Sequence, residues 1–146
     1  MSDGLEMEYR PDVVVGKYDP KKFDPTGQQV LLNEVFYSIQ GEGLNAGRAA
    51  FFVRTSKCNL ACKFCDTEFE TGTLKAAKGI ADQALDSGTK WVVLTGGEPG
   101  LQNLEPLVDM LHEREIQVAI ETSGSVFASW MRKLDHVCIS PKVKLS

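Results

Sequence analysis

The sequence predicts an α/β fold in which a parallel sheet curls into an incomplete (β/α) barrel. Short apolar runs rich in β-branched and aromatic residues alternate with segments whose apolar residues recur at helical spacing. Strands that alternate with helices pair in parallel, because each helix carries the chain back along the sheet. The 146 residues, 42% of them hydrophobic, are enough for one domain with its own core.

An irregular N-terminal arm is expected at residues 1–28, and the α/β domain at residues 29–146. The arm carries three prolines among charged residues, which indicates irregular structure with one short extended piece at Val13–Val15. The domain opens with two runs that predict strands, VLLNEVFYSI (30–39) and AAFFVRTS (49–56), each bounded by glycine or polar residues.

The remaining elements follow in alternation. The stretch LKAAKGIADQALDSG predicts a helix that ends at Gly88, because its apolar residues share one face: Leu74, Ala77, Ile80, Ala81 and Ala84. WVVLT (91–95) predicts a short buried strand. The same reasoning predicts, in order, a helix at 103–114, a strand at 117–121, a short helix at 127–133 and a strand at 136–140.

Three cysteines, Cys58, Cys62 and Cys65, have the spacing C-x3-C-x2-C in the stretch CNLACKFC. Three thiolates on one loop can hold three irons of a 4Fe-4S cluster, and the loop supplies no thiolate for the fourth iron. That iron stays open for a ligand, such as the amino and carboxylate groups of S-adenosylmethionine (SAM). A reduced cluster can then cleave the sulfonium bond to give a 5'-deoxyadenosyl radical.

The same cysteines leave other interpretations open. Structural zinc would need a remote fourth ligand (Cys138, His112 or His136), although zinc sites usually show two separated pairs of ligands. A disulfide is less favoured, because the N-terminus does not look like a secretory signal and disulfides are rare in the cytosol. Cys138 lies in the apolar stretch HVCIS and is most simply a buried strand residue, and both histidines are expected to be structural.

Composition narrows the class of partner. A formal net charge of -4 gives no basic surface for a nucleic acid, so a small-molecule substrate is expected. The sequence has no apolar run of membrane-spanning length. A cytoplasmic location is therefore expected.

The candidate motifs come directly after predicted strands. In parallel α/β folds ligands bind beyond the carboxyl ends of the strands, and this is where SIQGEG, the cysteine loop, TGGEP, ETSG and SPK would fall. One mouth of the sheet is expected to collect all five. The glycine pair of TGGEP would let the backbone approach a ligand. Taken alone, a glycine pair after a strand is more often a simple turn, but the nearby cysteine triplet favours the ligand-binding interpretation.

From Asn33 to Lys142 the chain resembles the 7-carboxy-7-deazaguanine synthase family of the radical SAM superfamily. The similarity rests on SIQGEG (38–43), FVR (52–54), Phe64 before the last cysteine, CDT (65–67), TGGEP, ETSG and SPK in this order. The resemblance implies a carbon–nitrogen lyase that contracts 6-carboxy-5,6,7,8-tetrahydropterin to 7-carboxy-7-deazaguanine with loss of ammonia, in queuosine and related deazapurine biosynthesis. It also implies a 4Fe-4S cluster, SAM, Mg²⁺, an electron donor such as a flavodoxin or ferredoxin, and a homodimer.

Carried over by position, the resemblance assigns the cluster to the three cysteines and Mg²⁺ to Thr67. The pterin would contact Ile39, Gln40, Gly41, Glu42, Arg54 and Thr95. SAM would contact Phe64, Asp66, Gly96, Gly97, Glu98, Glu121, Ser123, Ser140, Pro141 and Lys142. No residue is assigned as a catalytic acid or base.

Some of these residues also suit plainer roles. The planar fork of Arg54 can meet a substrate carboxylate with two parallel hydrogen bonds, but the residue also suits a surface ion pair. Glu42 suits a loop cap and Thr67 a helix start. For Glu121 and Ser123, contacts to the ribose hydroxyls compete with capping of the following helix.

The length of the chain leaves further alternatives. Family members continue beyond the SPK segment with elements that help close the substrate pocket, whereas this sequence stops at Ser146. It is then either a truncated or minimal form, or a form that a second chain completes. A glycyl-radical activating enzyme shares the cysteine spacing but acts on a protein, and SIQGEG and CDT argue against it. A non-catalytic, cluster-binding protein is the third reading.

Overall fold

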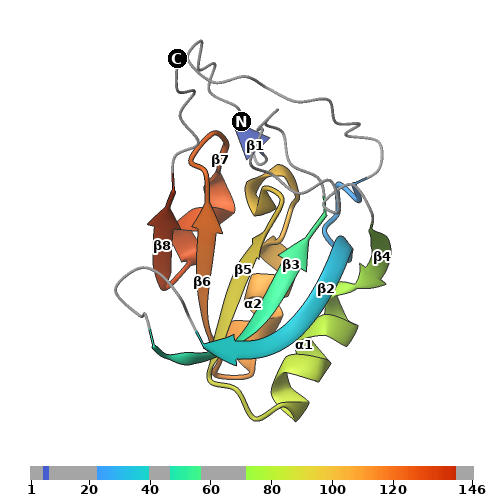
Figure 1. Cartoon of the computed structure of the whole chain (residues 1–146). Helices are drawn as coiled ribbons and strands as arrows, with labels where there is room; N and C mark the ends of the chain where they lie inside the picture. The colour runs from blue at the N-terminus through green and yellow to red at the C-terminus, as the bar shows by residue number, and fades with distance from the viewer. Residues whose placement is uncertain (1–4, 7–22, 40–46, 57–71, 141–146) are drawn as a thin grey trace.

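The computed structural model describes residues 5–6, 23–39, 47–56 and 72–140. Six strands in this part of the chain form one sheet in the order β4-β2-β3-β5-β6-β8, and helices α1 and α2 cover one of its faces (Figure 1). Four neighbouring strands run parallel: β3 (Ala49–Thr55), β5 (Trp91–Gly96), β6 (Gln117–Thr122) and β8 (His136–Ile139). The predicted α/β class is confirmed.

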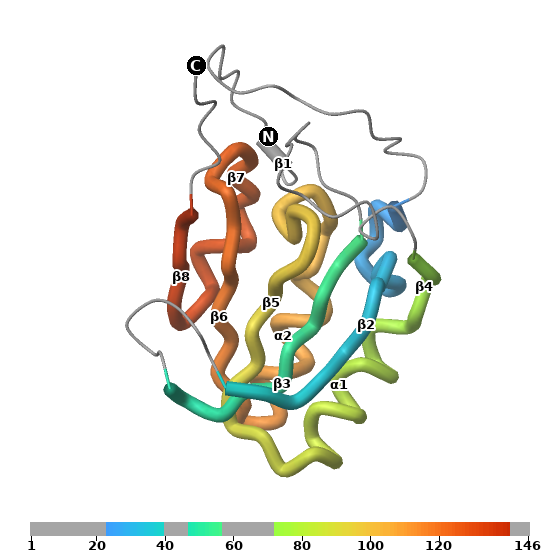
Figure 2. The backbone as a smooth tube through the Cα atoms, in the orientation of Figure 1, coloured from blue at the N-terminus to red at the C-terminus, as the bar shows by residue number. Residues whose placement is uncertain are grey.

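The sheet is mixed, however, and not wholly parallel. Strand β2 (Gln29–Ile39) pairs antiparallel with β3, and β4 (Thr73–Ala76) pairs antiparallel with β2. In Figure 2 the tube of β2 descends to the lower end of the molecule, from which β3 returns upward. The reason lies in the connection, because residues 40–48 are too few for the crossover of about a dozen or more residues that parallel strands need.

Helix α1 spans Ala77–Asp86 and begins later than predicted. Its buried residues are the predicted ones except Leu74, namely Ala77, Ile80, Ala81 and Ala84. Leu74 lies instead in β4, is 46% exposed and pairs with Leu31 of β2. The backbone hydrogen bonds of an open sheet edge therefore override the helical spacing of this one leucine.

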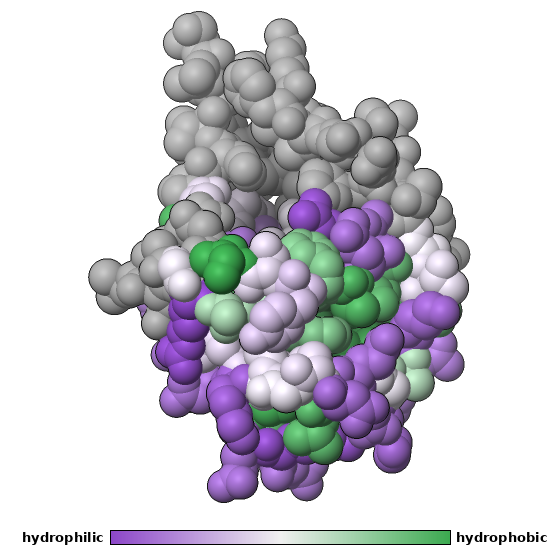
Figure 3. Space-filling model, turned by 60° about the horizontal axis from the view of Figure 1, so that its bottom comes forward, coloured by the Kyte–Doolittle hydropathy of each residue, from purple (hydrophilic) through white to green (hydrophobic). Residues whose placement is uncertain are grey.

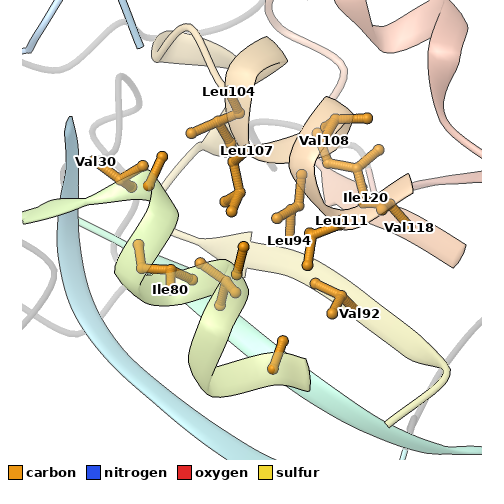
Figure 4. Packing of buried hydrophobic residues seen from close by; sticks show 14 of the residues in the cluster. Val30, Ile80, Val92, Leu94, Leu104, Leu107, Val108, Leu111, Val118 and Ile120 are labelled. Carbon is orange, nitrogen blue, oxygen red and sulfur yellow. The ribbon is translucent and has the colours of Figure 1, made fainter. Parts of the chain in front are cut away.

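The main core lies between the sheet and the two helices. Helix α2 (Glu105–Glu113) contributes Leu107, Val108 and Leu111, which are fully buried. Figure 4 shows these side chains and Ile80 of α1 pointing toward residues of β5 and β6. Burial of each such side chain stabilises the fold by about 1.5–3 kcal/mol, so this layer is the principal source of stability.

The opposite face of the sheet carries a smaller apolar cluster. Its buried members are Ala50, Phe52, Trp91, Val93 and Ala119, with Phe36 packed against them. The rings of Phe36 and Phe52 are stacked with centroids 5.0 Å apart. This cluster forms an apolar floor beside the polar residues described below.

Several short elements complete the described part. The segment expected to be a short helix at 127–133 is a two-residue strand, β7 (Phe127–Ala128), followed by a 3₁₀ turn, η4 (Ser129–Lys133). Strand β1 (Leu5–Glu6), within the expected arm, pairs antiparallel with β7. A second 3₁₀ turn, η3 (Pro99–Leu101), follows the TGGEP motif. Val13–Val15 lies outside the described residues.

Residues 23–28 of the expected arm are tied to the domain. Asp24 accepts hydrogen bonds from Thr26 and Gln29, and these bonds lower the pKa of its carboxyl, with Thr26 the larger cause. The amide of Asn103 donates to the carbonyl of Pro25 at 3.1 Å. This segment therefore packs where α2 begins.

Ion pairs connect the helical elements at the surface. Arg114 at the end of α2 donates to Asp82 of α1 at 2.7 Å, and Lys78 pairs with the same carboxylate at 3.0 Å. Hydrogen bonds from Lys78 and then Arg114 lower the pKa of Asp82. Lys133 of η4 bridges Glu105 and Asp109 of α2, which raises the pKa of this lysine. None of the helices in the described ranges is long and apolar enough to cross a membrane.

Candidate active site

The carboxyl ends of the four parallel strands meet at the upper edge of the sheet in Figure 1. Strand β5 ends there in TGGEP, β6 in ETSG, and β8 leads to Ser140. In the sequence the cysteine triplet comes after β3, and it lies outside the described residues. The structure thus brings together the ends of three strands that the sequence predicts to carry ligand-binding motifs.

A row of polar residues crosses the sheet just below this edge. Arg54 of β3 is the register partner of Thr95 of β5, and Thr95 donates a hydrogen bond to Oε1 of Glu121 on β6 at 3.1 Å. Their neighbours on the same strands, such as Val53, Leu94 and Ile120, are fully buried in the core under the helices. Because side chains alternate along a strand, the polar row faces away from the helices.

The row continues on both sides with residues that the sequence reasoning did not assign to the site. Glu34 of β2 is the register partner of Arg54, and Cys138 of β8 is the partner of Glu121. A bulge between Leu32 and Glu34 sets this alignment on the β2 side, and no residue in the sequence marks a bulge there. Cys138 could have been found from the alternation of side chains along HVCIS, which places it on the same face as Glu121 once β8 is aligned with β6.

Arg54 is half-buried and lies over the apolar floor. Its guanidinium carbon is 5.3 Å from the ring centroid of Phe36, a distance at which a cation is attracted to an aromatic face. Phe36 is itself stacked on Phe52, so the ring is fixed in place. The stacking pre-orients the guanidinium beside the polar row.

The TGGEP segment is fastened to the end of β3. The amide of Gly97 donates to the carbonyl of Thr55 at 3.1 Å, and the hydroxyl of Thr55 donates to the carbonyl of Thr95 at 3.2 Å. Gly96 has a φ of 119°, and a Cβ there would lie 2.3 Å from the carbonyl oxygen of Thr55. Gly96 is therefore needed for the close contact between two strands, and the contact of its backbone with a ligand stays a prediction.

Glu98 fastens the same segment to the end of β6. Its carboxylate is fully buried and accepts hydrogen bonds from Thr122, Ser123 and the backbone of Gly100 at 2.6–2.9 Å. The sequence predicts a SAM contact for Glu98; the structure surrounds its carboxylate with donors from the protein. Ser123 belongs to the same network, and no helix begins directly after it.

The end of β8 completes the site edge. The amide of Ser140 donates to the carbonyl of Thr122 at 2.8 Å, which continues the pairing of β8 with β6. His112 lies away from this edge and pairs with Asp135 at 2.9 Å, in agreement with the structural role expected for it. Within the described ranges, no group of three or more His, Cys, Asp or Glu residues could hold a metal ion.

Ile39 lies at the other end of the sheet. Its register partner is Ala49 at the start of β3, whereas Arg54 is near the end of that strand. The expectation that one mouth collects every motif is therefore wrong for the described start of SIQGEG, because β2 runs antiparallel. This lower end faces the reader in Figure 3, where hydrophobic and hydrophilic side chains intermingle, and Ile39 is 59% exposed.

Other predicted site residues lie outside the described residues. These are Gln40, Gly41, Glu42, Cys58, Cys62, Phe64, Cys65, Asp66, Thr67, Pro141 and Lys142.

The amino-acid sequence matches the radical SAM superfamily over residues 52–141, more than half of the chain. The chain belongs to the radical SAM superfamily. The match starts in β3 and runs through the cysteine triplet, TGGEP and ETSG. Members of this superfamily bind a 4Fe-4S cluster and SAM, so these two groups are the cofactors that the site must accommodate.

Curated relatives narrow the resemblance. The 7-carboxy-7-deazaguanine synthase of Bacteroides thetaiotaomicron is 45% identical over 111 residues, covering 76% of this chain and 60% of the relative. That of Bradyrhizobium diazoefficiens is 39% identical and covers 76% and 62%. The crystal structure of QueE from Escherichia coli superposes with a TM-score of 0.67 at 25% identity, covering 89% of this chain and 67% of that one. The chain spans about 60% of the length of these two curated relatives.

The described residues at the carboxyl ends of β5 and β6 fit SAM. Thr95, Gly96, Gly97 and Glu121 are only half-buried, so a ligand can reach them. This edge of the sheet therefore offers SAM hydroxyl, backbone and carboxylate groups. The cysteine triplet that would hold the cluster lies outside the described residues.

Proposed function

We propose that the chain contracts 6-carboxy-5,6,7,8-tetrahydropterin to 7-carboxy-7-deazaguanine with loss of ammonia. The observation that carries the proposal is the row formed by Arg54, Thr95 and Glu121 on the face opposite the helices. It combines a cation, a hydroxyl and a carboxylate, which suits a polar heterocycle that bears a carboxylate. The relatives named 7-carboxy-7-deazaguanine synthase support the same assignment.

Arg54 would bind the substrate carboxylate through its planar guanidinium, with the apolar floor beneath it. Thr95 donates its proton to Glu121, so its hydroxyl oxygen can accept a hydrogen bond from the substrate. Glu121 would meet the ribose hydroxyls of SAM. The bond between Thr95 and Glu121 then joins a residue that contacts the substrate with one that contacts the cosubstrate.

When bound, SAM and the reduced cluster supply the radical that starts the ring contraction. Cys58, Cys62 and Cys65 would hold the cluster, and an electron donor such as a flavodoxin or ferredoxin would reduce it. Thr67 would hold Mg²⁺ together with substrate oxygens and waters, as this hard cation prefers. A Thr67→Ala variant whose turnover keeps its full dependence on Mg²⁺ would remove Thr67 from that role.

The proposed activity has a direct test. This test is anaerobic incubation of the chain with the tetrahydropterin, SAM and a reductant. Formation of 7-carboxy-7-deazaguanine supports the proposal. SAM cleavage without product under all conditions would contradict it.

The role of Arg54 has its own test. Arg54→Ala should lose a charge-assisted pair worth roughly 2–5 kcal/mol toward the substrate, and Arg54→Lys should bind but lose the bidentate geometry. The loss should be smaller for an analogue without the 6-carboxylate. Binding of both ligands to the wild type and to Arg54→Ala closes a double-mutant cycle. A coupling free energy near zero would mean that Arg54 does not bind the carboxylate.

A further inference from the structure

Glu98 is a charged residue with no solvent-exposed surface, although it lies in a motif expected to bind SAM. Its Oε1 accepts hydrogen bonds from the backbone N–H of Ser123 at 2.8 Å and from the hydroxyl of the same residue at 2.6 Å. Its Oε2 accepts from the backbone N–H of Gly100 at 2.9 Å and from the hydroxyl of Thr122 at 2.6 Å. Each oxygen therefore has two donors from the protein.

A carboxylate offers about four lone-pair positions, two on each oxygen. The four donors match that number, and the burial of Glu98 closes the approach of any further donor. The ammonium group of SAM is a further donor, and it would have to displace a hydroxyl or a backbone N–H from the carboxylate. Displacement would leave a buried polar group without its partner, which is unfavourable.

The hydroxyl group of Ser123 likewise makes all its hydrogen bonds within the protein. It has one hydroxyl proton, and that proton goes to Glu98. Its oxygen lies 2.8 Å from the hydroxyl oxygen of Ser125, which must therefore be the donor of that pair, and it also accepts from the backbone N–H of Ser125 at 3.3 Å. One donor and two acceptor positions exhaust a serine hydroxyl. A ribose hydroxyl would have to break this arrangement.

The network joins the segment after β5 to the end of β6. Thr95 and Glu121, which are bonded to each other, lie three residues before Glu98 and one residue before Thr122 on these two strands. On its other side the TGGEP segment is fastened to Thr55 of β3. The buried carboxylate therefore fixes how far apart the ends of β5 and β6 lie, and with them the two groups that face the ligand.

We propose that Glu98 is a positioning residue, which holds TGGEP and ETSG together, and not a ligand of SAM. Contacts to SAM from these two segments then come from the backbone at Gly96 and Gly97 and from Glu121. The identity of the ligand rests on the proposed function, but the network itself does not.

Three variants test this inference: Glu98→Gln, Thr122→Val and the double variant. Thr122 is buried and its side chain points to the helix side of the sheet, so it cannot touch SAM. Thr89→Val is the matched control, because Thr89 is a buried threonine bonded to Trp91 at the opposite end of β5. Each variant is measured twice, by thermal unfolding of the cluster-free chain and by SAM affinity after anaerobic cluster reconstitution.

In the cluster-free chain, Glu98→Gln and Thr122→Val should each lower the unfolding midpoint by about 5–10 °C, and the double variant should lower it by clearly less than the sum. In the reconstituted chain, both single variants should weaken SAM binding by a similar factor, roughly 2- to 30-fold. Thr89→Val should lower the midpoint but leave SAM affinity unchanged. A purely structural role would not produce this difference between the two threonines.

Two results would overturn the inference. One is a weakened SAM affinity in Glu98→Gln with an unchanged affinity in Thr122→Val, which would show that Glu98 contacts SAM directly. The other is full additivity of the two midpoint shifts, which would show that the two residues do not share a network. If the wild-type chain fails to bind SAM at all, the proposed function is refuted, and the cluster-free midpoints still decide whether the network exists.

Discussion

Gln102 is bonded to the backbone of β2 through its side-chain amide, and its replacement gives a sharp test of the fold. Its amide oxygen accepts from the backbone N–H of Leu31 at 2.9 Å, and its amide nitrogen donates to the carbonyl of Leu31 at 2.9 Å. The residue is only 2% exposed and follows the TGGEP segment by way of η3. It therefore ties the candidate site to the strand that carries Glu34.

Gln102→Leu keeps a similar side-chain volume, so little cavity is created and the hydrogen bonds are the main loss. The N–H of Leu31 loses its partner, at a cost of about 1–3 kcal/mol, and the second bond adds about 1 kcal/mol. The carbonyl of Leu31 still accepts from the backbone of Ser56 at 3.0 Å, so it adds no further penalty. We expect the free energy of unfolding to fall by about 2–4 kcal/mol, out of the 5–15 kcal/mol typical of a domain.

Urea unfolding of the cluster-free chain measures this loss as a shift of the midpoint by roughly 1–2 M. Gln83→Leu, at an exposed position of α1, is the control and should stay within about 0.5 kcal/mol of the wild type. Gln102→Glu adds a second test. At neutral pH its carboxylate faces the carbonyl of Leu31, and acidification should reduce its deficit relative to the wild type, since a protonated carboxyl can donate. A Gln102→Leu variant as stable as the control would refute the reasoning.

Three other predictions concern the cluster, the TGGEP turn and the helix surface. Anaerobic reconstitution should give about four irons per chain by iron analysis, because Cys58, Cys62 and Cys65 would ligate a 4Fe-4S cluster. Replacing any one of these three cysteines with Ala should abolish iron binding, whereas Cys138→Ala should keep it. Loss of iron in Cys138→Ala would contradict ligation by the three thiolates. Gly96→Ala should lower the free energy of unfolding by about 3 kcal/mol or more, because the new Cβ would lie 2.3 Å from the carbonyl oxygen of Thr55 and the backbone φ is 119°. Gly79→Ala is the control and should be neutral or stabilising, since Gly79 lies in α1 with open space around it. The lowered pKa of Asp82 means that its pairs with Lys78 and Arg114 stabilise the fold above pH 3.8 and lose that effect as the pH falls through the folded-state pKa; an Asp82→Asn variant with an unchanged acid unfolding profile would contradict this.

The elements of the fold could largely be predicted from the local sequence. Apolar runs marked β3, β5, β6 and β8, and helical spacing marked α1 and α2, because burial against a flat sheet or a helix imposes periods that are visible along the chain. The cysteine spacing and the motifs after the strands likewise indicated the radical SAM superfamily, which the comparison confirms. Where a strand ends and a polar motif begins is a local property.

Only the tertiary structure determined the direction of each strand in the sheet and the residues with which it pairs. Leu74 fits a helical face by spacing, yet it joins β4 because the edge of β2 offers backbone hydrogen bonds there. The antiparallel course of β2 moves Ile39 to the far end of the sheet, since its short connection to β3 cannot make a crossover.

Glu98 shows the same limit of prediction from the sequence within the candidate site. The sequence by itself determined that a carboxylate stands in a glycine-rich segment after β5, and that a threonine and a serine stand at the end of β6. Only the tertiary structure determined that these groups meet, because their hydrogen bonds join residues more than twenty positions apart in the chain. A buried carboxylate needs donors on every lone pair, and which donors it receives depends on how the strands are packed side by side.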